Sequence, residues 1–191
     1  MRRLLFLFAF LCAPVSAAPE PTSYVVVGER SQVAFDATFP LGDFSGTTDR
    51  VAGEFRLDPA DVPHGVLGSA SVNPASLKTG LEGRDRDLKQ TLEVNAHPEI
   101  SFQVEEVRSS FPSLTERADV ALHISGVMRI RSVERPVAWT GRARIEEGWL
   151  WVRGEAQIRL SDFGIRPPRK FFLAVGDLVR VSFDLRLAPR R

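Results

Sequence analysis

Apolar residues recur at every second position through most of this chain, with polar residues between them. This two-residue period is typical of β-strands that bury one face. Eight segments carry the pattern, at residues 33–39, 51–57, 66–72, 100–104, 118–124, 137–145, 152–160 and 179–187. Turn-forming residues separate several of them, as at Pro40–Gly42 and Asp58–Pro63. Because no long helical segments alternate with these strands, the pattern predicts an all-β protein with antiparallel neighbours.

Eight strands with one apolar face can form either two packed sheets or one closed barrel. Small residues interrupt the apolar faces, at Gly53, Gly68, Ala70, Gly141, Ala143, Gly154 and Ala156. A sandwich core would fill such positions with larger side chains, whereas a barrel must bend there and gains room inside. We therefore expect an eight-stranded antiparallel barrel with an apolar interior.

One segment departs from the strand period. Between residues 84 and 93, Leu88 and Leu92 are four apart among polar residues, and Asp85 and Lys89 have ion-pair spacing on a helix. This predicts one short amphipathic helix, with Asp85 or Asp87 accepting hydrogen bonds from the free amides of its first turn. Two carboxylates two residues apart on a helix point in different directions, so we favour this structural role over a catalytic pair.

The N-terminal residues have the features of a secretory signal peptide. Arg2 and Arg3 precede an apolar run at residues 4–11, and small residues follow at the expected cleavage site after Ala17. We expect residues 1–17 to be removed and residues 18–191 to form one domain. Removal takes away two arginines and the single cysteine, which lowers the net charge from +1 to −1 and excludes a disulfide. A near-neutral surface also argues against nucleic acid as a partner.

Candidate chemistry is sparse. His64, His97 and His123 have no metal-ligand spacing, and no serine lies in a nucleophile motif. We therefore predict no metal, no cofactor and no catalytic residue, so the protein is not expected to be an enzyme. Two alternatives remain open: haem ligation by His97, and an enzyme acting on a lipid with Asp85, Asp87 or His97 as acid or base.

Several stretches together resemble the YceI-like family. They are SQVAFDATFPLGDFSGTTDRVAGEF, SLKTGLEGRDRDLK, HPEISF, SDFGIRPP and GDLVRVSFDL, in this order across nearly the whole chain after the signal peptide. The resemblance implies a lipocalin-like barrel, secreted to the periplasm, that holds a long polyisoprenoid or similar amphiphilic lipid in its lumen. It also implies that the helix and its flanking loop cover one end of the barrel.

Strand alternation predicts which side chains face the lumen. The expected ligand-binding set is Val33, Phe35, Phe39, Phe55, Ala70, Val72, Ile100, Phe102, Val120, Leu122, Val181 and Phe183. An eight-stranded barrel is at the size where side chains either just fill the interior or leave space for one ligand. The family resemblance favours a cavity, with the lipid's polar head at the rim near Lys78, Arg84 or Arg86. The expected function is binding, transport or storage of an isoprenoid-type lipid.

An alternative function is a ligand-free interaction or stress-response module. Its barrel would be solid, and its binding surface would be the basic segment 129–135 with Trp149 and Trp151. The alternation places both indoles outside the barrel near a hairpin end, where they would either pack under a neighbouring loop or make transient contact with a membrane surface. The sequence does not indicate an oligomeric state.

Overall fold

The computed structural model describes residues 21–170 and 173–190, so the predicted signal peptide lies outside the described residues. The strands are β1 (Thr22–Val26), β2 (Gln32–Ala37), β3 (Phe44–Thr48), β4 (Val51–Leu57), β5 (Leu67–Val72), β6 (Ile100–Ser109), β7 (Val120–Ile130), β8 (Val133–Glu146), β9 (Trp149–Arg159), β10 (Arg169–Lys170), β11 (Leu173–Ala174) and β12 (Leu178–Pro189). The helical elements are η1 (Gly28–Arg30), η2 (Pro74–Ser76), α1 (Glu82–Thr91) and η3 (Leu160–Phe163). Within the described ranges, no helix is long and apolar enough to cross a membrane.

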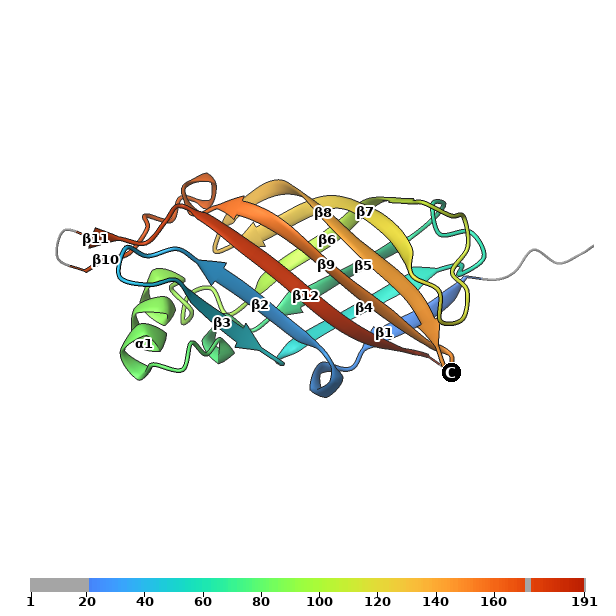
Figure 1. The fold of residues 1–191 in the computed structure, drawn as a ribbon, viewed down its shortest axis with the longest axis horizontal. Coiled ribbons are helices and arrows are strands. Elements are labelled where there is room, and N and C mark those ends of the chain that lie inside the picture. Colours follow the sequence, from blue (N-terminus) through green and yellow to red (C-terminus); the bar gives the residue numbers. More distant parts are fainter. Residues whose placement is uncertain (1–20, 171–172, 191) are drawn as a thin grey trace, which may run out of the picture.

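The main sheet closes on itself as a barrel (Figure 1). Its strands follow the order β1, β4, β5, β6, β7, β8, β9 and β12, and β12 pairs with β1 to complete the ring. Every pairing in the ring is antiparallel. The structure therefore confirms the predicted eight-stranded antiparallel barrel with one α-helix.

The start of the chain differs from the sequence-based expectation, because strands β1 and β3 were not predicted. β1 and β2 pair with successive parts of β12, at residues 187–189 and 179–184, and η1 separates them. Ser31 stabilises this interruption: its hydroxyl donates to the Val27 carbonyl at 2.8 Å and accepts from the Arg186 amide at 3.0 Å. β2 then ends at Ala37, so Phe39 lies in the following loop instead of in a strand.

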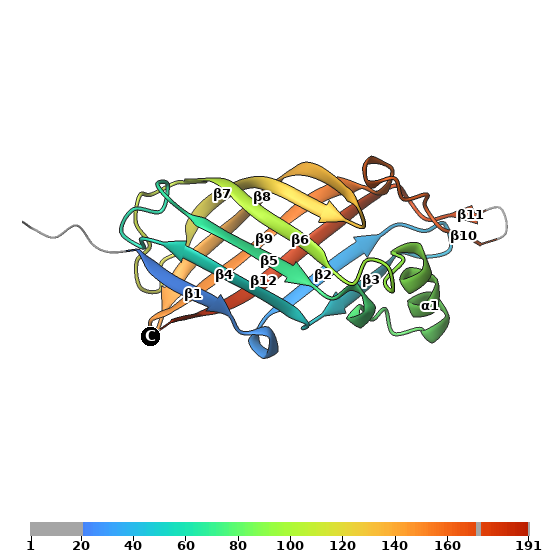
Figure 2. The ribbon, with the colours of Figure 1, turned by 180° about the vertical axis from the view of Figure 1, so that it is seen from behind.

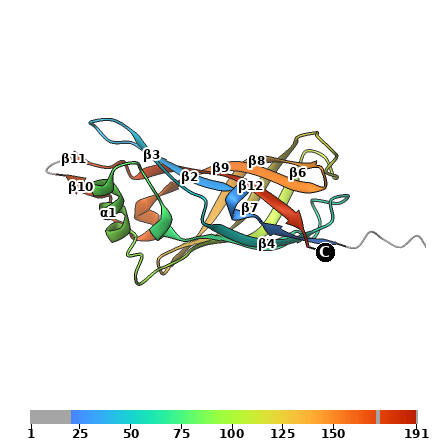
Figure 3. The same cartoon turned by 90° about the horizontal axis from the view of Figure 1, so that it is seen from below.

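The two ends of the barrel carry different structures (Figures 1 and 2). One end holds α1, the β2–β3 loop and the β10–β11 hairpin, whereas the C-terminus lies at the other. Figure 3 shows the same arrangement from below. Buried apolar side chains near the chain termini include Tyr24, Leu57, Leu114 and Leu187. Those near α1 include Leu77, Leu92, Phe163 and Ile165.

The predicted helix is present, but its aspartate does not cap it. The Asp85 carboxylate accepts two hydrogen bonds from Thr79, one from the backbone amide at 2.7 Å and one from the hydroxyl at 2.6 Å. The residue before the helix, Leu81, makes no side-chain cap. Asp85 thus links the first turn of α1 to the preceding loop, which fixes the helix over its end of the barrel.

Candidate functional site: an apolar cavity in the barrel

The barrel encloses a cavity of about 260 Å³. Every barrel strand except β1 contributes to its wall, and β2, β3 and α1 complete it. None of the described residues that line it is charged. Apart from Trp139, the polar residues in the lining are Ser71, Thr91 and Ser101. The interior is therefore suited to an apolar guest, because a charge placed there would lose its hydration without a counter-ion.

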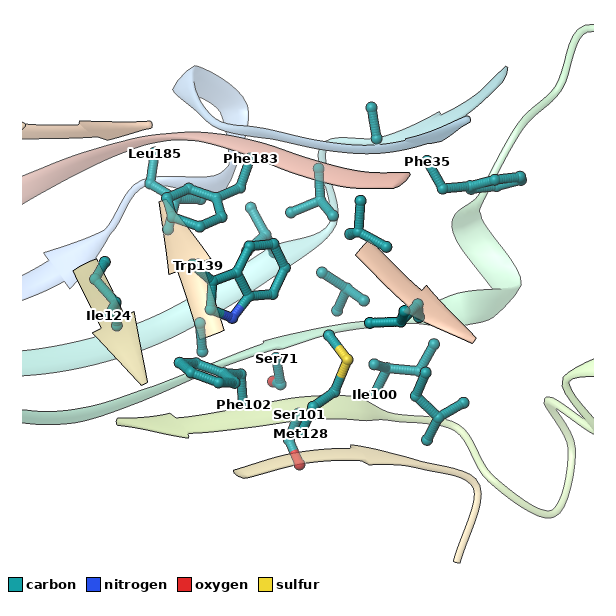
Figure 4. A pocket seen from close by; sticks show the side chains of 18 of the residues that line it. Phe35, Ser71, Ile100, Ser101, Phe102, Ile124, Met128, Trp139, Phe183 and Leu185 are labelled. Atoms are coloured by element: carbon teal, nitrogen blue, oxygen red, sulfur yellow. The ribbon is translucent and has the colours of Figure 1, made fainter. Parts of the chain in front are cut away.

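Three aromatic rings meet in the middle of this cavity, and we call Phe102, Trp139 and Phe183 the central aromatic cluster (Figure 4). The Trp139 ring lies edge-on to both neighbours, with its centroid 5.7 Å from that of Phe102 and 5.2 Å from that of Phe183. Phe102 and Phe183 contact the buried groups near both ends of the barrel. The cluster thus marks the midpoint of the lumen.

The lumen phenylalanines lie against glycines of neighbouring strands. Phe183 is directly opposite Gly154, and a Cβ added to that glycine would lie 2.8 Å from the ring. Phe55 and Gly68 form an equivalent pair, at 2.5 Å. The missing side chains make room for the rings, so Gly68 and Gly154, two of the small residues noted in the sequence, accommodate large neighbours on the lumen wall.

Ten of the twelve residues predicted to bind ligand line the cavity. They are Val33, Phe35, Phe55, Ala70, Val72, Ile100, Phe102, Leu122, Val181 and Phe183. Phe39 is not in the lining because its strand ends two residues earlier. Val120 is buried, but it packs among the side chains near the chain termini instead of on the cavity wall. That the lining residues bind a ligand stays a prediction.

Sequence reasoning omitted several wall residues from that set, and Trp139 is the most informative of them. The alternation in β8 correctly placed it inward, yet nothing in the sequence distinguished it from a packed core residue. Its indole nitrogen is buried and has no hydrogen-bond partner among the described residues. In contrast, Leu185 and Met128 are ordinary apolar additions to the wall.

Helix α1 closes one end of the cavity. Leu88, Thr91 and the following Leu92 line it, and the Arg84 guanidinium lies 4.2 Å from the centroid of the Phe44 ring. Lys78 pairs through its backbone with Thr47, with both N–H···O distances at 2.9 Å, and keeps its side chain exposed. Cations are therefore placed at this end of the molecule, outside the uncharged lining.

The side chains considered for catalysis or metal binding do not come together. Asp85 is buried with Thr79, whose hydroxyl and amide hold the pKa of the carboxyl below its ordinary value, while Asp87 is exposed. His97 lies 3.8 Å from a Glu93 carboxylate oxygen and does not line the cavity. In the described ranges, no three histidine, cysteine or acidic side chains group as metal ligands would.

Arginines lie over both outward indoles: one, Arg30 of η1, is 5.1 Å from the ring centroid of the partly buried Trp149, and three surround Trp151. Trp151 is only 7% exposed, and its Nε1–H donates to Asp184 Oδ1 at 2.5 Å. Guanidinium carbons of Arg144, Arg186 and Arg153 lie 3.4, 4.5 and 4.9 Å from its ring centroid. Trp151 is thus covered by charged side chains instead of by a loop, and it offers little apolar surface to a membrane.

The basic segment 129–135 is partly neutralised. Arg129 lies 3.3 Å from Glu99, and Arg131 forms an ion pair with Glu93, just beyond α1. These pairs connect the β7–β8 turn to the segment that carries the helix. Two of the cations assigned to the alternative interaction surface therefore already have partners within the protein.

An antiparallel eight-stranded barrel with an apolar cavity and a helix across one end defines a lipocalin-like protein. Residues 24–187 match the model of the YceI-like domain, so the chain belongs to the YceI-like family. A comparison with curated proteins finds no match.

Solved structures support the same fold. BcnA of Burkholderia cenocepacia aligns with a TM-score of 0.72 at 15% identity, covering 84% of this chain and 98% of that one. A polyisoprenoid-binding domain from Saccharophagus degradans aligns at 0.69 and 13% identity, covering 88% and 99%. The YceI protein of Campylobacter jejuni aligns at 0.60 and 14% identity, covering 76% and 84%. At these identities the likeness establishes the fold alone.

Proposed function

We propose that this protein binds a long isoprenoid-type lipid in the barrel lumen and transports or stores it in the periplasm. The observation that carries the proposal is the uncharged, apolar cavity running along the inside of a closed barrel. Membership of the YceI-like family supports it, as does the likeness to a domain described as polyisoprenoid-binding. The signal-peptide features of residues 1–17 support export.

The energetics favour a long hydrocarbon chain. Each methylene group moved from water into an apolar site contributes about 0.8 kcal/mol, so a few isoprene units supply substantial affinity without any polar contact. The aliphatic and aromatic wall offers many such contacts and requires no charged group to lose its hydration. Affinity on this proposal comes from burial, and the protein performs no chemistry on its ligand.

The cavity volume indicates where a long chain must extend. A volume of about 260 Å³ is just below the usual range for small-molecule pockets, about 300–1,000 Å³. Because Leu88 and Leu92 close the lumen at the α1 end, a longer chain would displace the helix or leave the barrel beside it. An anionic head emerging there would be near Lys78, Arg84 and Arg86.

The proposal is tested by native mass spectrometry of protein purified from its own periplasm, followed by analysis of the organic extract. We expect one prenyl lipid per protein. Recovery of the protein from the cytoplasm alone, or without stoichiometric lipid, contradicts the proposal.

A cavity-filling variant locates the lipid. Ala70 lines the cavity opposite Phe102, so Ala70→Phe should place a ring in the lumen and abolish lipid retention. Ser69→Phe is the matched control, because Ser69 is exposed on the same strand and its substitution should leave retention unchanged. If Ala70→Phe retains lipid at the unsubstituted level, the ligand does not occupy the lumen.

A further inference from the structure

The wall of the barrel has a seam at the α1 end that no strand ladder closes. Near the chain termini, β1 joins β12 to β4, but near α1 its place between them is taken by β2 and β3. Among the described strands β3 pairs only with β2, although β4 follows it in the chain. The free edge of β3 therefore faces the segment 74–79, which contains η2 and leads to α1 (Figure 2).

Few contacts close this seam. Thr47 and Lys78 form an isolated antiparallel pair, with both N–H···O distances at 2.9 Å, and no further backbone hydrogen bond links β3 to residues 74–79 within the described ranges. In contrast, residues 178–187 of β12 pair without a break with residues 150–159 of β9. Parting the seam thus breaks far fewer hydrogen bonds than parting such a ladder, so the wall should open first at the seam.

The two ends of the seam are held by different contacts. At one end, the buried Thr48 hydroxyl lies 2.5 Å from Ser76 Oγ, and because Ser76 itself donates to the Asn73 carbonyl at 2.6 Å, Thr48 is the donor. At the other end, the Arg84 guanidinium of α1 lies 4.2 Å from the centroid of the Phe44 ring of β3. The buried hydrogen bonds fix β3 to η2, whereas the cation–π contact can break without leaving a buried polar group unpaired.

The seam leads directly to the lumen. Phe44 of β3 and Leu77, which follows η2, both line the cavity, one on each side of the seam. Separation of these two side chains would open the cavity through the side of the barrel. Leu88 and Leu92, with which α1 and the residue after it cover the end of the lumen, need not move.

Helix α1 is also tied to the strands β7 and β8. The Glu93 carboxylate, just beyond the helix, forms an ion pair with Arg131 of the β7–β8 turn, and Arg129 of β7 lies 3.3 Å from Glu99. Displacing the helix from the end of the barrel requires these pairs to break. Separating β3 from residues 74–79 leaves them intact.

We propose that the lipid enters and leaves the lumen sideways, through the seam between β3 and residues 74–79, while α1 stays over the end of the barrel. This inference rests on the proposed function. Thr48 and Ser76 form the hinge, and the contact between Arg84 and Phe44 closes the opposite end. An apolar chain passes between Phe44 and Leu77, so it crosses the wall without meeting a buried charge.

A disulfide across the seam tests this route. Directly opposed residues in a hydrogen-bonded antiparallel pair have Cα atoms about 5.5 Å apart, and disulfides span about 4.4–6.8 Å. Thr47→Cys combined with Lys78→Cys should therefore form a disulfide on oxidation, and the chain after residue 17 has no other cysteine. Native mass spectrometry follows the uptake of geranylgeraniol, a prenyl alcohol, by delipidated protein. We expect oxidation to slow uptake at least about tenfold and reduction to restore it.

The matched control joins two strands within a continuous ladder. His123 and Thr140 are exposed and directly opposite each other on β7 and β8, so cysteines at both positions form a disulfide away from the seam. This disulfide should leave the uptake rate unchanged. Equal rates in the oxidised and reduced forms of the seam variant overturn the inference and leave the proposed function intact. If the unsubstituted protein takes up no geranylgeraniol, the proposed function fails and the inference fails with it.

Two single substitutions separate the seam from the helix and need no disulfide. Arg84→Gln removes the guanidinium from Phe44 and should speed uptake by about two- to fivefold, the contribution of one partly exposed cation–π contact. Glu93→Gln removes the ion pair with Arg131 and should leave the rate unchanged. An unchanged rate in Arg84→Gln overturns the inference. Faster uptake in Glu93→Gln overturns it as well, because it shows that α1 is displaced instead.

Discussion

Trp139 and Trp151 belong to the same hairpin of β8 and β9, yet they lie on opposite faces of the barrel wall. Both are nearly buried, at 5% and 7% exposure. Inside, Trp139 packs among apolar side chains that include the rings of Phe102 and Phe183, and its N–H has no partner among the described residues. Outside, Trp151 donates to Asp184 and is covered by guanidinium groups.

The difference shows that the two faces of the wall are stabilised in different ways. On the outer face, Asp119 interacts with Arg144 at 3.2 Å and Arg153 at 3.5 Å, so charged neighbours from different strands cover the buried ring. On the inner face, polar groups are few and the apolar surface borders the cavity. Stability therefore comes from packing and ion pairs around the wall, whereas the inner surface is left available for a ligand.

The largest expected effect comes from removing the space that an inner glycine provides. In Gly154→Val, the new Cβ would lie 2.8 Å from Phe183 Cζ, so the ring must move into the lumen. Overpacking of this kind costs about 1–3 kcal/mol, which urea unfolding measures. Ala138→Val, at an exposed position of β8, is the control and should change stability by no more than about 0.5 kcal/mol. Equal losses of stability in Gly154→Val and Ala138→Val would show that the position of the Phe183 ring does not depend on the absence of a side chain at residue 154.

An intermediate effect is expected from replacing each tryptophan by phenylalanine. Trp151→Phe removes the donor from the half-buried Asp184 carboxylate, so we expect a loss of about 1–2 kcal/mol. Trp139→Phe removes a donor that has no partner in residues 21–170 and 173–190, which offsets part of the lost packing, so its cost should be below about 1 kcal/mol. Urea unfolding of both variants measures the difference. A larger cost at Trp139 would indicate that its N–H is paired within the protein.

The alternation of apolar residues predicted the long strands because each of them separates lumen from solvent, and the small residues on their apolar faces then favoured a barrel over two packed sheets. It did not reveal β3, whose sequence FSGTT has one large apolar residue. The reason is visible in the register: Phe35 covers Gly46, so the apolar group that fills this position comes from the neighbouring strand. Such compensation depends on strand pairing, which a single sequence does not specify.

The candidate site was predictable in the same limited sense. Alternation gives the side of the wall on which a residue lies, and this placed Phe102 and Trp139 inside and Trp151 outside. Whether a buried indole finds an acceptor depends on residues distant in sequence: Trp151 reaches Asp184 through the pairing of β9 with β12. Trp139 packs against Phe102 and Phe183 within an apolar cluster, and that arrangement follows from three-dimensional packing alone.

The smallest expected effect is the response of the two faces to acid. On the outer face, a hydrogen bond from Ser45 and the Arg180 guanidinium hold the pKa of Asp36 below its ordinary value of 3.8. Because the folded-state pKa is lowered, this carboxylate stabilises the fold above its unfolded pKa, and the contribution is lost as pH falls through the folded value. The lining contains no titratable side chain among the described residues, so acid should not act on the lumen directly.

We therefore expect the melting temperature of the unsubstituted protein to fall slightly between about pH 6 and about pH 3, and Asp36→Asn to show a smaller fall over the same range. Lipid affinity should stay constant wherever the protein remains folded, because burial of a neutral chain releases no proton. Calorimetric melting and lipid titration at each pH measure the two quantities separately. A lipid affinity that changes with pH in the folded protein would mean that an ionised group contacts the ligand. The inner face of the wall would then not be free of charge, and the contrast with the charged outer face would be weaker than the structure indicates.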